Sequence, residues 1–157
     1  MLFGPLAKRF FLTSGYGEAS TELNAFDAAL LEAGIGDTNL IKLSSILPPG
    51  AEEVEPYQLP KGSLVPLAYG ERISSEPGTT ISASVAVGIP FDPTAAGLIM
   101  ECSRVGDPGP CEEAVRAMVR EGMEVIRGTR IKEIKSISAT WTVRRVGAVF
   151  AAVVLCP

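Results

Sequence analysis

The chain of 157 residues contains no histidine. A Ser-His-Asp triad and a Cys-His pair both need an imidazole, so both kinds of nucleophilic catalysis are excluded. Most zinc sites need imidazoles or paired thiolates, and the three cysteines (Cys102, Cys111 and Cys156) form no CxxC pair. We therefore expect no metal site. Any catalysis must use carboxylates, lysines, hydroxyls, backbone amides or a cofactor.

An excess of positive charge and long hydrophobic runs are also absent. Eighteen acidic against fourteen basic residues give a net charge of −4, which disfavours binding to a phosphate backbone. The longest apolar run, residues 146–156, is shorter than the ~18 residues that a membrane-spanning helix needs. At the amino terminus the basic residues follow the apolar stretch, unlike in a secretory signal. We expect a cytoplasmic protein that binds neither nucleic acid nor membrane.

The spacing of apolar residues predicts two helices and six or seven strands in a single domain spanning residues 1–157. Neither an internal repeat nor a linker interrupts this pattern. Two helices against this many strands predict an α+β sandwich. The strands are expected at 8–14, 39–47, 63–73, 79–89, 97–102, 131–143 and 147–155.

The first helix is expected between an N-cap at Ser20 or Thr21 and Gly34, and the second over residues 111–127. Gly15 and Gly17 are expected to end the first strand. Helical spacing assigns the buried faces to Leu23, Phe26, Leu30 and Ala33 in the first helix, and to Val115, Met118, Val119 and Ile126 in the second.

Two serines, Ser44 and Ser45, interrupt the otherwise apolar run NLIKLSSILPPG just before a double proline. Serines at the end of a strand usually form local hydrogen bonds. A second pair, Ser74 and Ser75, also ends a strand before a turn, and nothing near it resembles a site. The dipeptide alone is therefore a weak signal.

Carboxylates supply the other candidate groups. Glu101 follows the apolar run LIM, where lost hydration raises the pKa of a carboxyl and lets it donate a proton near neutral pH. The alternative is a glutamate at a strand end that reaches solvent. Asp27, Asp37 and Asn39 gather around the glycine turn GIG, where they fit either turn and cap chemistry or a site.

Four stretches make the sequence recognisable: KRFFLTSGYG, LNAFDAALLEAGIGDTNLIKLSSILPPG, KGSLVPLAYG and GLIMEC. Together they resemble the pyruvoyl-dependent arginine decarboxylases over nearly the whole chain. The resemblance implies a layered α/β/β/α sandwich, with two main helices on mixed or antiparallel sheets. It also implies a homotrimer whose sites are shared between neighbouring protomers.

The resemblance further implies a proenzyme that cuts itself into residues 1–44 and 45–157. The Ser45 hydroxyl attacks the Ser44 carbonyl, and elimination and loss of ammonia then leave a pyruvoyl group made from Ser45. Asn39 and the glycine turn are candidate donors to the developing oxyanion. The pyruvoyl group forms a Schiff base with the amine of an amino-acid substrate and withdraws electrons as carbon dioxide leaves.

Substrate roles also come from the resemblance. Glu101 matches the position of the acid that returns a proton, and Asp27 matches the position that meets the substrate guanidinium. Gly36 and Thr38 match further substrate-binding positions. The implied reaction converts L-arginine to agmatine, which feeds polyamine biosynthesis.

Three other functions stay open at the level of sequence. One is the same cofactor chemistry on a different amino acid, and another is an uncleaved, non-catalytic trimeric binding protein. A serine hydrolase ranks last, because the chain has neither a histidine base nor a GxSxG elbow.

Overall fold

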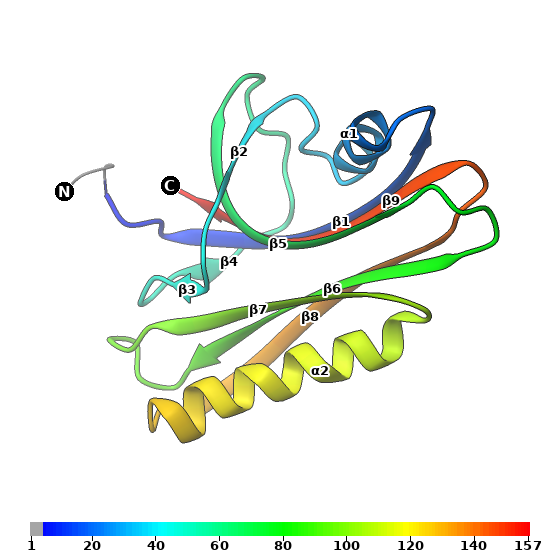
Figure 1. Cartoon of the computed structure of the whole chain (residues 1–157). Coiled ribbons are helices and arrows are strands. Elements are labelled where there is room, and N and C mark those ends of the chain that lie inside the picture. The colour runs from blue at the N-terminus through cyan, green and yellow to red at the C-terminus, as the bar shows by residue number, and fades with distance from the viewer. Residues whose placement is uncertain (1–4) are drawn as a thin grey trace.

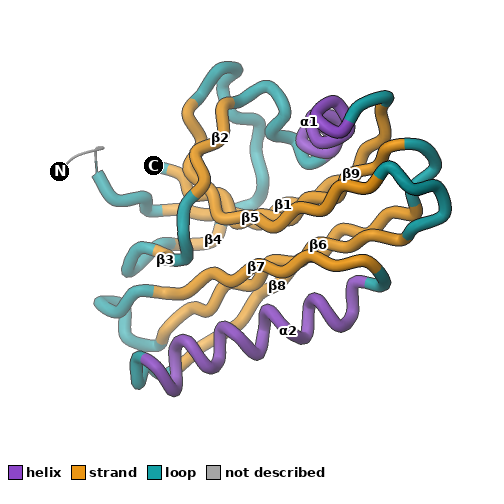
Figure 2. Tube along the Cα trace, viewed as in Figure 1, coloured by secondary structure: helices purple, strands orange, loops and turns teal. Residues whose placement is uncertain are grey.

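The computed structural model describes residues 5–157, which form two stacked sheets covered by a helix on each outer side (Figures 1 and 2). The first sheet has the strand order β2-β5-β9-β1-β4, and the second β3-β7-β6-β8. The first sheet comprises β1 (Arg9–Ala19), β2 (Asn39–Lys42), β4 (Glu52–Glu53), β5 (Leu64–Ser74) and β9 (Val146–Cys156). The second comprises β3 (Ile46–Leu47), β6 (Thr80–Pro90), β7 (Gly97–Val105) and β8 (Ile131–Thr142).

Helix α1 (Glu22–Glu32) packs on the first sheet, and α2 (Pro108–Arg120) packs on the second. A π-helical turn, η1 (Glu121–Ile126), continues α2. The order helix, sheet, sheet, helix confirms the predicted α/β/β/α sandwich.

Strand β9 explains the longest apolar run of the sequence. It lies in the middle of the first sheet, between β1 and β5. One face, with Val149 and Ala151, packs in the core between the sheets, while the other, with Ala148 and Phe150, packs under α1. A strand buried on both faces must be apolar throughout. No helix within residues 5–157 is long and apolar enough to cross a membrane.

The prediction that Gly15 and Gly17 end the first strand is wrong, because β1 continues to Ala19. Both glycines lie under α1. A Cβ atom at Gly15 would collide with the carbonyl oxygen of Ala29, and one at Gly17 would lie 2.6 Å from the Cβ of Ala28. These glycines therefore allow a close approach of helix and sheet.

The start and end of α1 are confirmed, but its buried face is partly wrong. The Thr21 side chain accepts a hydrogen bond from the backbone of Asn24, and Gly34 has a φ of 82° after the last turn. The close packing of α1 on β1 buries the small residues Ala25 and Ala29. Leu23, predicted to be buried, is left 76% exposed.

The second helix begins earlier than predicted and buries a different set of side chains. It starts at Pro108, which suits the first turn of a helix because its missing N–H has no partner there. Val115 and Val119 are buried as predicted, but Met118 and Ile126 are 40% and 70% exposed. The π-helical turn adds a residue per turn and brings Met123 into the core in their place.

Candidate functional site

The serine pair lies where the chain crosses from one sheet to the other. The Leu43 N–H still donates to Leu67 of β5 at 2.8 Å, whereas Ile46 already pairs with Leu98 of β7. The predicted single strand over 39–47 is therefore wrong. Its two halves pair with different sheets, so it divides into β2 and β3 (Figure 1).

The two serines make the crossing, and they differ in how they are held. Ser44 is exposed, while Ser45 is half-buried. The carbonyl oxygen of Ser45 accepts a hydrogen bond from the Ile99 N–H at 2.7 Å, just beyond the pairing of β3 with β7. The residue on the carboxyl side of the Ser44–Ser45 peptide bond is thus fixed to the second sheet through its own carbonyl.

Glu101 lies inside β7, two residues after Ile99. Strand β7 continues to Val105, so the prediction that a carboxylate ends this strand is wrong. Glu101 pairs with Val85, a residue of the core between the sheets, and therefore faces the first sheet. Residues two apart on a strand share a face. The strand that anchors Ser45 thus also carries the candidate acid.

Burial raises the pKa of the half-buried Glu101 carboxyl, as the sequence predicted, while the positive charge of Lys42 opposes the rise. The Lys42 ammonium lies 4.4 Å from the centre of the Tyr69 ring. The carboxyl is therefore placed to hold a proton at a higher pH than an exposed glutamate.

Asn39, Gly36 and Thr38 shape the turn before β2. The Asn39 amide nitrogen donates to the carbonyl oxygen of Gly62 at 3.1 Å, and the Thr38 hydroxyl donates to that of Ile35 at 2.7 Å. A Cβ atom at Gly36 would lie 2.6 Å from Leu31. These contacts hold the turn in place. The role of Asn39 as an oxyanion donor stays a prediction.

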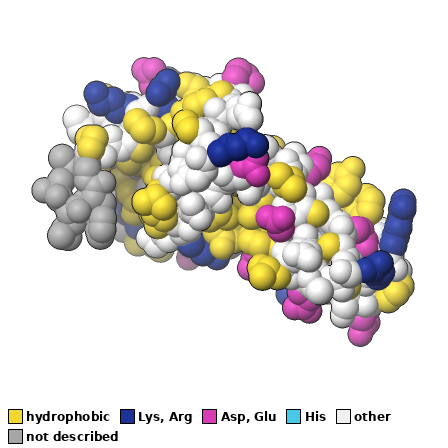
Figure 3. All heavy atoms as spheres, turned by 90° about the horizontal axis from the view of Figure 1, so that it is seen from above, with side chains coloured by type: hydrophobic (Ala, Val, Ile, Leu, Met, Phe, Trp, Pro, Cys, Tyr) yellow, Lys and Arg dark blue, Asp and Glu magenta, His cyan; other side chains and the backbone are white. Residues whose placement is uncertain are grey.

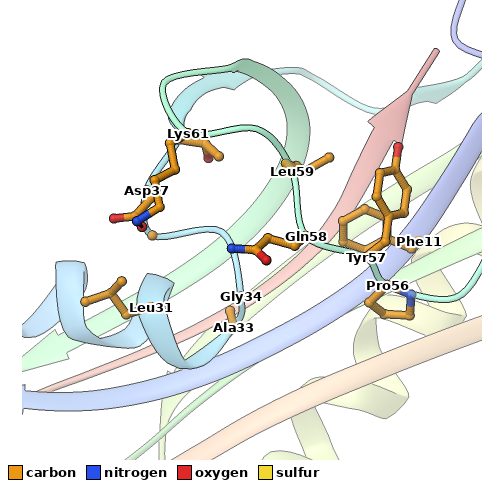
Figure 4. Close-up of a pocket in the computed structure, with 12 residues that line it drawn as sticks. Phe11, Leu31, Ala33, Gly34, Asp37, Pro56, Tyr57, Gln58, Leu59 and Lys61 are labelled. Carbon is orange, nitrogen blue, oxygen red and sulfur yellow. Dashed lines mark ion pairs between the residues drawn. The ribbon is translucent and has the colours of Figure 1, made fainter.

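Two hollows flank α1 and divide the predicted substrate-binding residues between them. The first, of about 400 Å³, includes Gly36, Asp37 and Thr38 at one end of α1, with Tyr57 and Lys61 from the segment that follows β4 (Figure 4). The carboxylate of Asp37 pairs with the Lys61 ammonium at 2.9 Å, and both side chains are largely exposed. This ion pair supports the interpretation that Asp37 stabilises the turn.

The second hollow, of about 460 Å³, contains Asp27, which is exposed on α1. Phe26 of α1, Leu40 of β2 and Tyr69 of β5 also line it. Ser45 and Glu101 line neither of these two hollows. Within one protomer, the predicted guanidinium-binding carboxylate is thus in a different hollow from Gly36 and Thr38.

Sequence reasoning missed Lys42 and Tyr69. Lys42 acts on Glu101 and contacts the Tyr69 ring, and Tyr69 lines the hollow that contains Asp27. Lys42 thus connects the surroundings of the candidate acid to an aromatic wall of the hollow that contains Asp27. A signal was available, because Tyr69 belongs to the recognised stretch KGSLVPLAYG.

A family model described as pyruvoyl-dependent arginine decarboxylase matches residues 9–157. The chain belongs to this family. The pyruvoyl-dependent arginine decarboxylase of Methanococcus vannielii is 49% identical over 144 residues, which cover 92% of this chain and 87% of that protein. The enzyme of the same name from Pyrococcus abyssi is 44% identical over 153 residues, which cover 96% of each chain.

Membership of the pyruvoyl-dependent arginine decarboxylases means that the cofactor is a pyruvoyl group. The crossing between the sheets fits such a group. It has serine hydroxyls on both sides of the Ser44–Ser45 peptide bond, and the Ile99 N–H holds the carbonyl of Ser45. A half-buried carboxyl, Glu101, follows on the same strand.

Proposed function

We propose that this chain cuts itself between Ser44 and Ser45 and uses the pyruvoyl group made from Ser45 to convert L-arginine to agmatine and carbon dioxide. The observation that carries the proposal is the short crossing at Ser44 and Ser45, in which the Ile99 N–H holds the Ser45 carbonyl at 2.7 Å. The residue whose hydroxyl attacks is thus held in place directly after the Ser44 carbonyl, an arrangement that favours intramolecular attack.

Self-cleavage and formation of the pyruvoyl group consume one water and need no other reagent. The Ser45 hydroxyl oxygen bonds to the Ser44 carbonyl carbon, the peptide C–N bond breaks, and the hydroxyl proton passes to the Ser45 nitrogen. Loss of the Ser45 Cα proton then breaks the new ester and releases the Ser44 carboxylate. Water adds to the remaining dehydroalanine, and ammonia leaves. Residues 1–44 become the small chain and 45–157 the large chain.

The new end of the large chain keeps its anchor in β3 and β7. The Ser45 carbonyl stays bonded to Ile46, so the Ile99 N–H still holds the residue that carries the cofactor. The pyruvoyl group supplies an electron sink while the substrate loses carbon dioxide. Glu101 holds the proton that the product needs, because burial keeps its carboxyl protonated to higher pH.

Asp27 is the group that we assign to the substrate guanidinium. A carboxylate meets the planar guanidinium fork with two charge-assisted hydrogen bonds. Aromatic walls from Phe26 and Tyr69 line the same hollow, and guanidinium groups stack well on such rings. We assign Gly36 and Thr38 to substrate binding as well, Gly36 through its backbone and Thr38 through its hydroxyl.

A homotrimer of cleaved protomers would complete each site across a subunit interface. The division of Asp27, Gly36 and Thr38 between two hollows supports shared sites. Leu23 and Leu64 are 76% and 71% exposed, which leaves apolar surface that such an assembly would cover. Figure 3, the view from above Figure 1, shows hydrophobic side chains at several places on the upper face of the molecule. We also propose a cytoplasmic location and a product used for polyamine biosynthesis.

A denaturing intact-mass spectrum of freshly purified protein tests the proposal. We expect one species that ends at Ser44, and a second that lacks one ammonia relative to a chain starting at Ser45. A single full-length mass that persists through long incubation near neutral pH would contradict it and would favour a non-catalytic binding protein.

Substitution of Asp27 tests the substrate. We expect Asp27→Ala to lower arginine turnover roughly a hundredfold, because the substrate loses two charge-assisted hydrogen bonds. Self-cleavage should proceed normally. Glu22→Ala is the matched control, because it removes the same charge from the first turn of the same helix. Unchanged arginine kinetics in Asp27→Ala would remove this role and direct attention to another amino acid as substrate.

A further inference from the structure

Gly70, in the middle of β5, lies directly against Glu101. It pairs with Ala151, a residue of the core between the sheets, so it faces the second sheet. A Cβ atom at Gly70 would lie 3.3 Å from the Cβ of Glu101 and 3.2 and 3.5 Å from the carbonyl oxygens of Cys102 and Ser84. An alanine here would force its neighbours to move by a few tenths of an ångström.

The neighbours of Gly70 cannot move independently. Ser84 of β6 and Cys102 of β7 face each other in the ladder of the second sheet, so both carbonyl oxygens belong to one hydrogen-bonded unit. Gly88 offers a contrast, because a Cβ atom there would collide with the side chains of Met123 and Val119 instead of backbone. These side chains belong to η1 and α2 on the outer side of the second sheet, so a methyl group at Gly88 presses on the helical layer and not on the surroundings of Glu101.

We propose that Gly70 is a positioning residue for Glu101: lacking a side chain, it lets β5 close over β7 and holds the Glu101 carboxyl in a fixed, water-poor place between the sheets. The inference rests on the proposed function, in which Glu101 is the proton donor. It also gives a role to the stretch KGSLVPLAYG, which ends at Gly70.

The surroundings of Glu101 make its hydration sensitive to this contact. Lys42 is the charged group that acts on it from β2. Arg72 lies on the same face of β5 as Gly70, because it pairs with Val149 of the core, but it is exposed. The residue opposite Glu101 on β6, Val85, is apolar and buried. Separation of β5 from β7 would therefore admit water more readily than it would bring a new charge.

The primary test follows the titration of the Glu101 carboxyl by NMR, with ¹³C-labelled glutamate and with Glu101→Gln to assign the signal. In Gly70→Ala we expect the midpoint to fall by about half a pH unit, because water reaches the carboxyl. Gly88→Ala is the control for overpacking, because its new methyl group collides with Met123 and Val119 on the α2 side of the second sheet and not with the surroundings of Glu101. We expect the wild-type midpoint there. A wild-type midpoint in Gly70→Ala would overturn the proposal.

A kinetic test asks whether Gly70 acts through the Glu101 carboxyl. We expect Gly70→Ala to cleave itself as the wild type does and to decarboxylate arginine about tenfold more slowly, since small displacements of a reacting group are costly. In a Glu101→Gln background the same change should cause no further loss. An equal loss in both backgrounds would overturn the proposal, because Gly70 would then act on another group.

A second variant keeps the proposal testable if Gly70→Ala folds poorly. Glu101→Asp preserves the contacts of the backbone and withdraws the carboxyl by one methylene. We expect normal self-cleavage and slow turnover, and wild-type turnover would show that the position of the carboxyl is unimportant. The NMR titration needs no cofactor. A chain that stays uncleaved but shows the shift would therefore refute the proposed function without refuting the contact between Gly70 and Glu101.

Discussion

Two serine pairs lie at two crossings between the same two sheets. Ser44 and Ser45 connect β2 of the first sheet to β3 of the second, and Ser74 and Ser75 begin the connection from β5 to β6. The first crossing consists of the serines themselves, and its carbonyl is held by β7. The second is a longer turn in which the Ser74 hydroxyl accepts a hydrogen bond from the Glu76 N–H at 3.2 Å.

The comparison shows that partners, not the dipeptide, distinguish a candidate site from a turn. At the second crossing, the Thr79 N–H donates to the Glu76 carbonyl oxygen at 3.2 Å and Gly78 has a φ of 85°, so the turn is closed by a hydrogen bond of its own. At the first crossing, the backbone of Ser45 is bound to the strand that carries Glu101. The first crossing is therefore bound to the strand that carries the candidate acid Glu101, whereas the second is stabilised by hydrogen bonds within its turn.

The largest difference between the two crossings is expected when the second serine of each pair is replaced in turn. Ser45→Ala has no hydroxyl to attack the Ser44 carbonyl, so we expect one intact chain of 157 residues by mass spectrometry. Ser75→Ala is the matched control and should be cut completely at the bond between Ser44 and Ser45. A Ser45→Ala chain that is still cut at this bond would refute the proposed mechanism.

The next effect separates cleavage from decarboxylation. Glu101→Gln should mature normally but turn over arginine about 10²- to 10⁴-fold more slowly, which is the usual contribution of a general acid. Burial raises the pKa of Glu101, and the donor must be protonated. Wild-type turnover should therefore fall as pH rises through that pKa, and the variant should lack this fall.

Glu76→Gln supplies the control at the second crossing. Glu76 is exposed in the turn after Ser75, so we expect wild-type turnover and the wild-type pH profile. Normal turnover in Glu101→Gln would assign the proton to another group.

The layered fold was predictable from sequence, but the crossing between the sheets at Ser44 and Ser45 was not. Alternating and continuous apolar runs define strands whichever sheet they join. The run over 39–47 therefore reads as one strand, although Leu43 bonds to β5 and Ile46 to β7. A change of sheet is decided by partners distant in sequence, and no local pattern records it.

The raised pKa of Glu101 and its cause, burial, were predicted from sequence, but the neighbours that bury the carboxyl were not. An apolar run before a carboxylate predicts burial, and burial does raise the pKa. The close approach of Gly70 comes from a strand far away in the sequence, so spacing along β7 does not reveal it. Glycine is ambiguous for the same reason: Gly15 and Gly17 read as breakers, although they admit a helix.

A smaller effect, on stability alone, is expected at the end of the molecule that holds the second serine pair. Glu18 and Ser74 both pair with Gly147 of β9. The Glu18 carboxylate accepts hydrogen bonds from the Trp141 indole N–H at 2.7 Å and from the Arg144 backbone N–H at 2.7 Å. Glu18→Ala should lower the free energy of unfolding by about 2 kcal/mol, without changing self-cleavage.

The pH dependence of this stability has a definite sign. Burial raises the pKa of Glu18, but the hydrogen bonds from the Arg144 backbone and the Trp141 indole, among others, outweigh it and lower the pKa overall. The contribution of Glu18 is therefore present above the ordinary carboxyl pKa and lost as pH falls through the lowered one. Denaturant unfolding at neutral and at acidic pH should show the deficit of Glu18→Ala shrink in acid. A constant deficit would mean that packing, not charge, is lost.

The smallest effect is expected at the second serine pair itself. Ser74→Ala removes one hydrogen bond, from the Glu76 N–H at 3.2 Å, in an exposed turn where water can replace the hydroxyl. The free energy of unfolding should fall by about 0.5 kcal/mol, measured by denaturant titration, and the extent of cleavage should stay that of the wild type. A loss well above 1 kcal/mol would mean that this crossing is held more tightly than its turn suggests. A change in cleavage would mean that the two crossings are coupled through the sheets that they join.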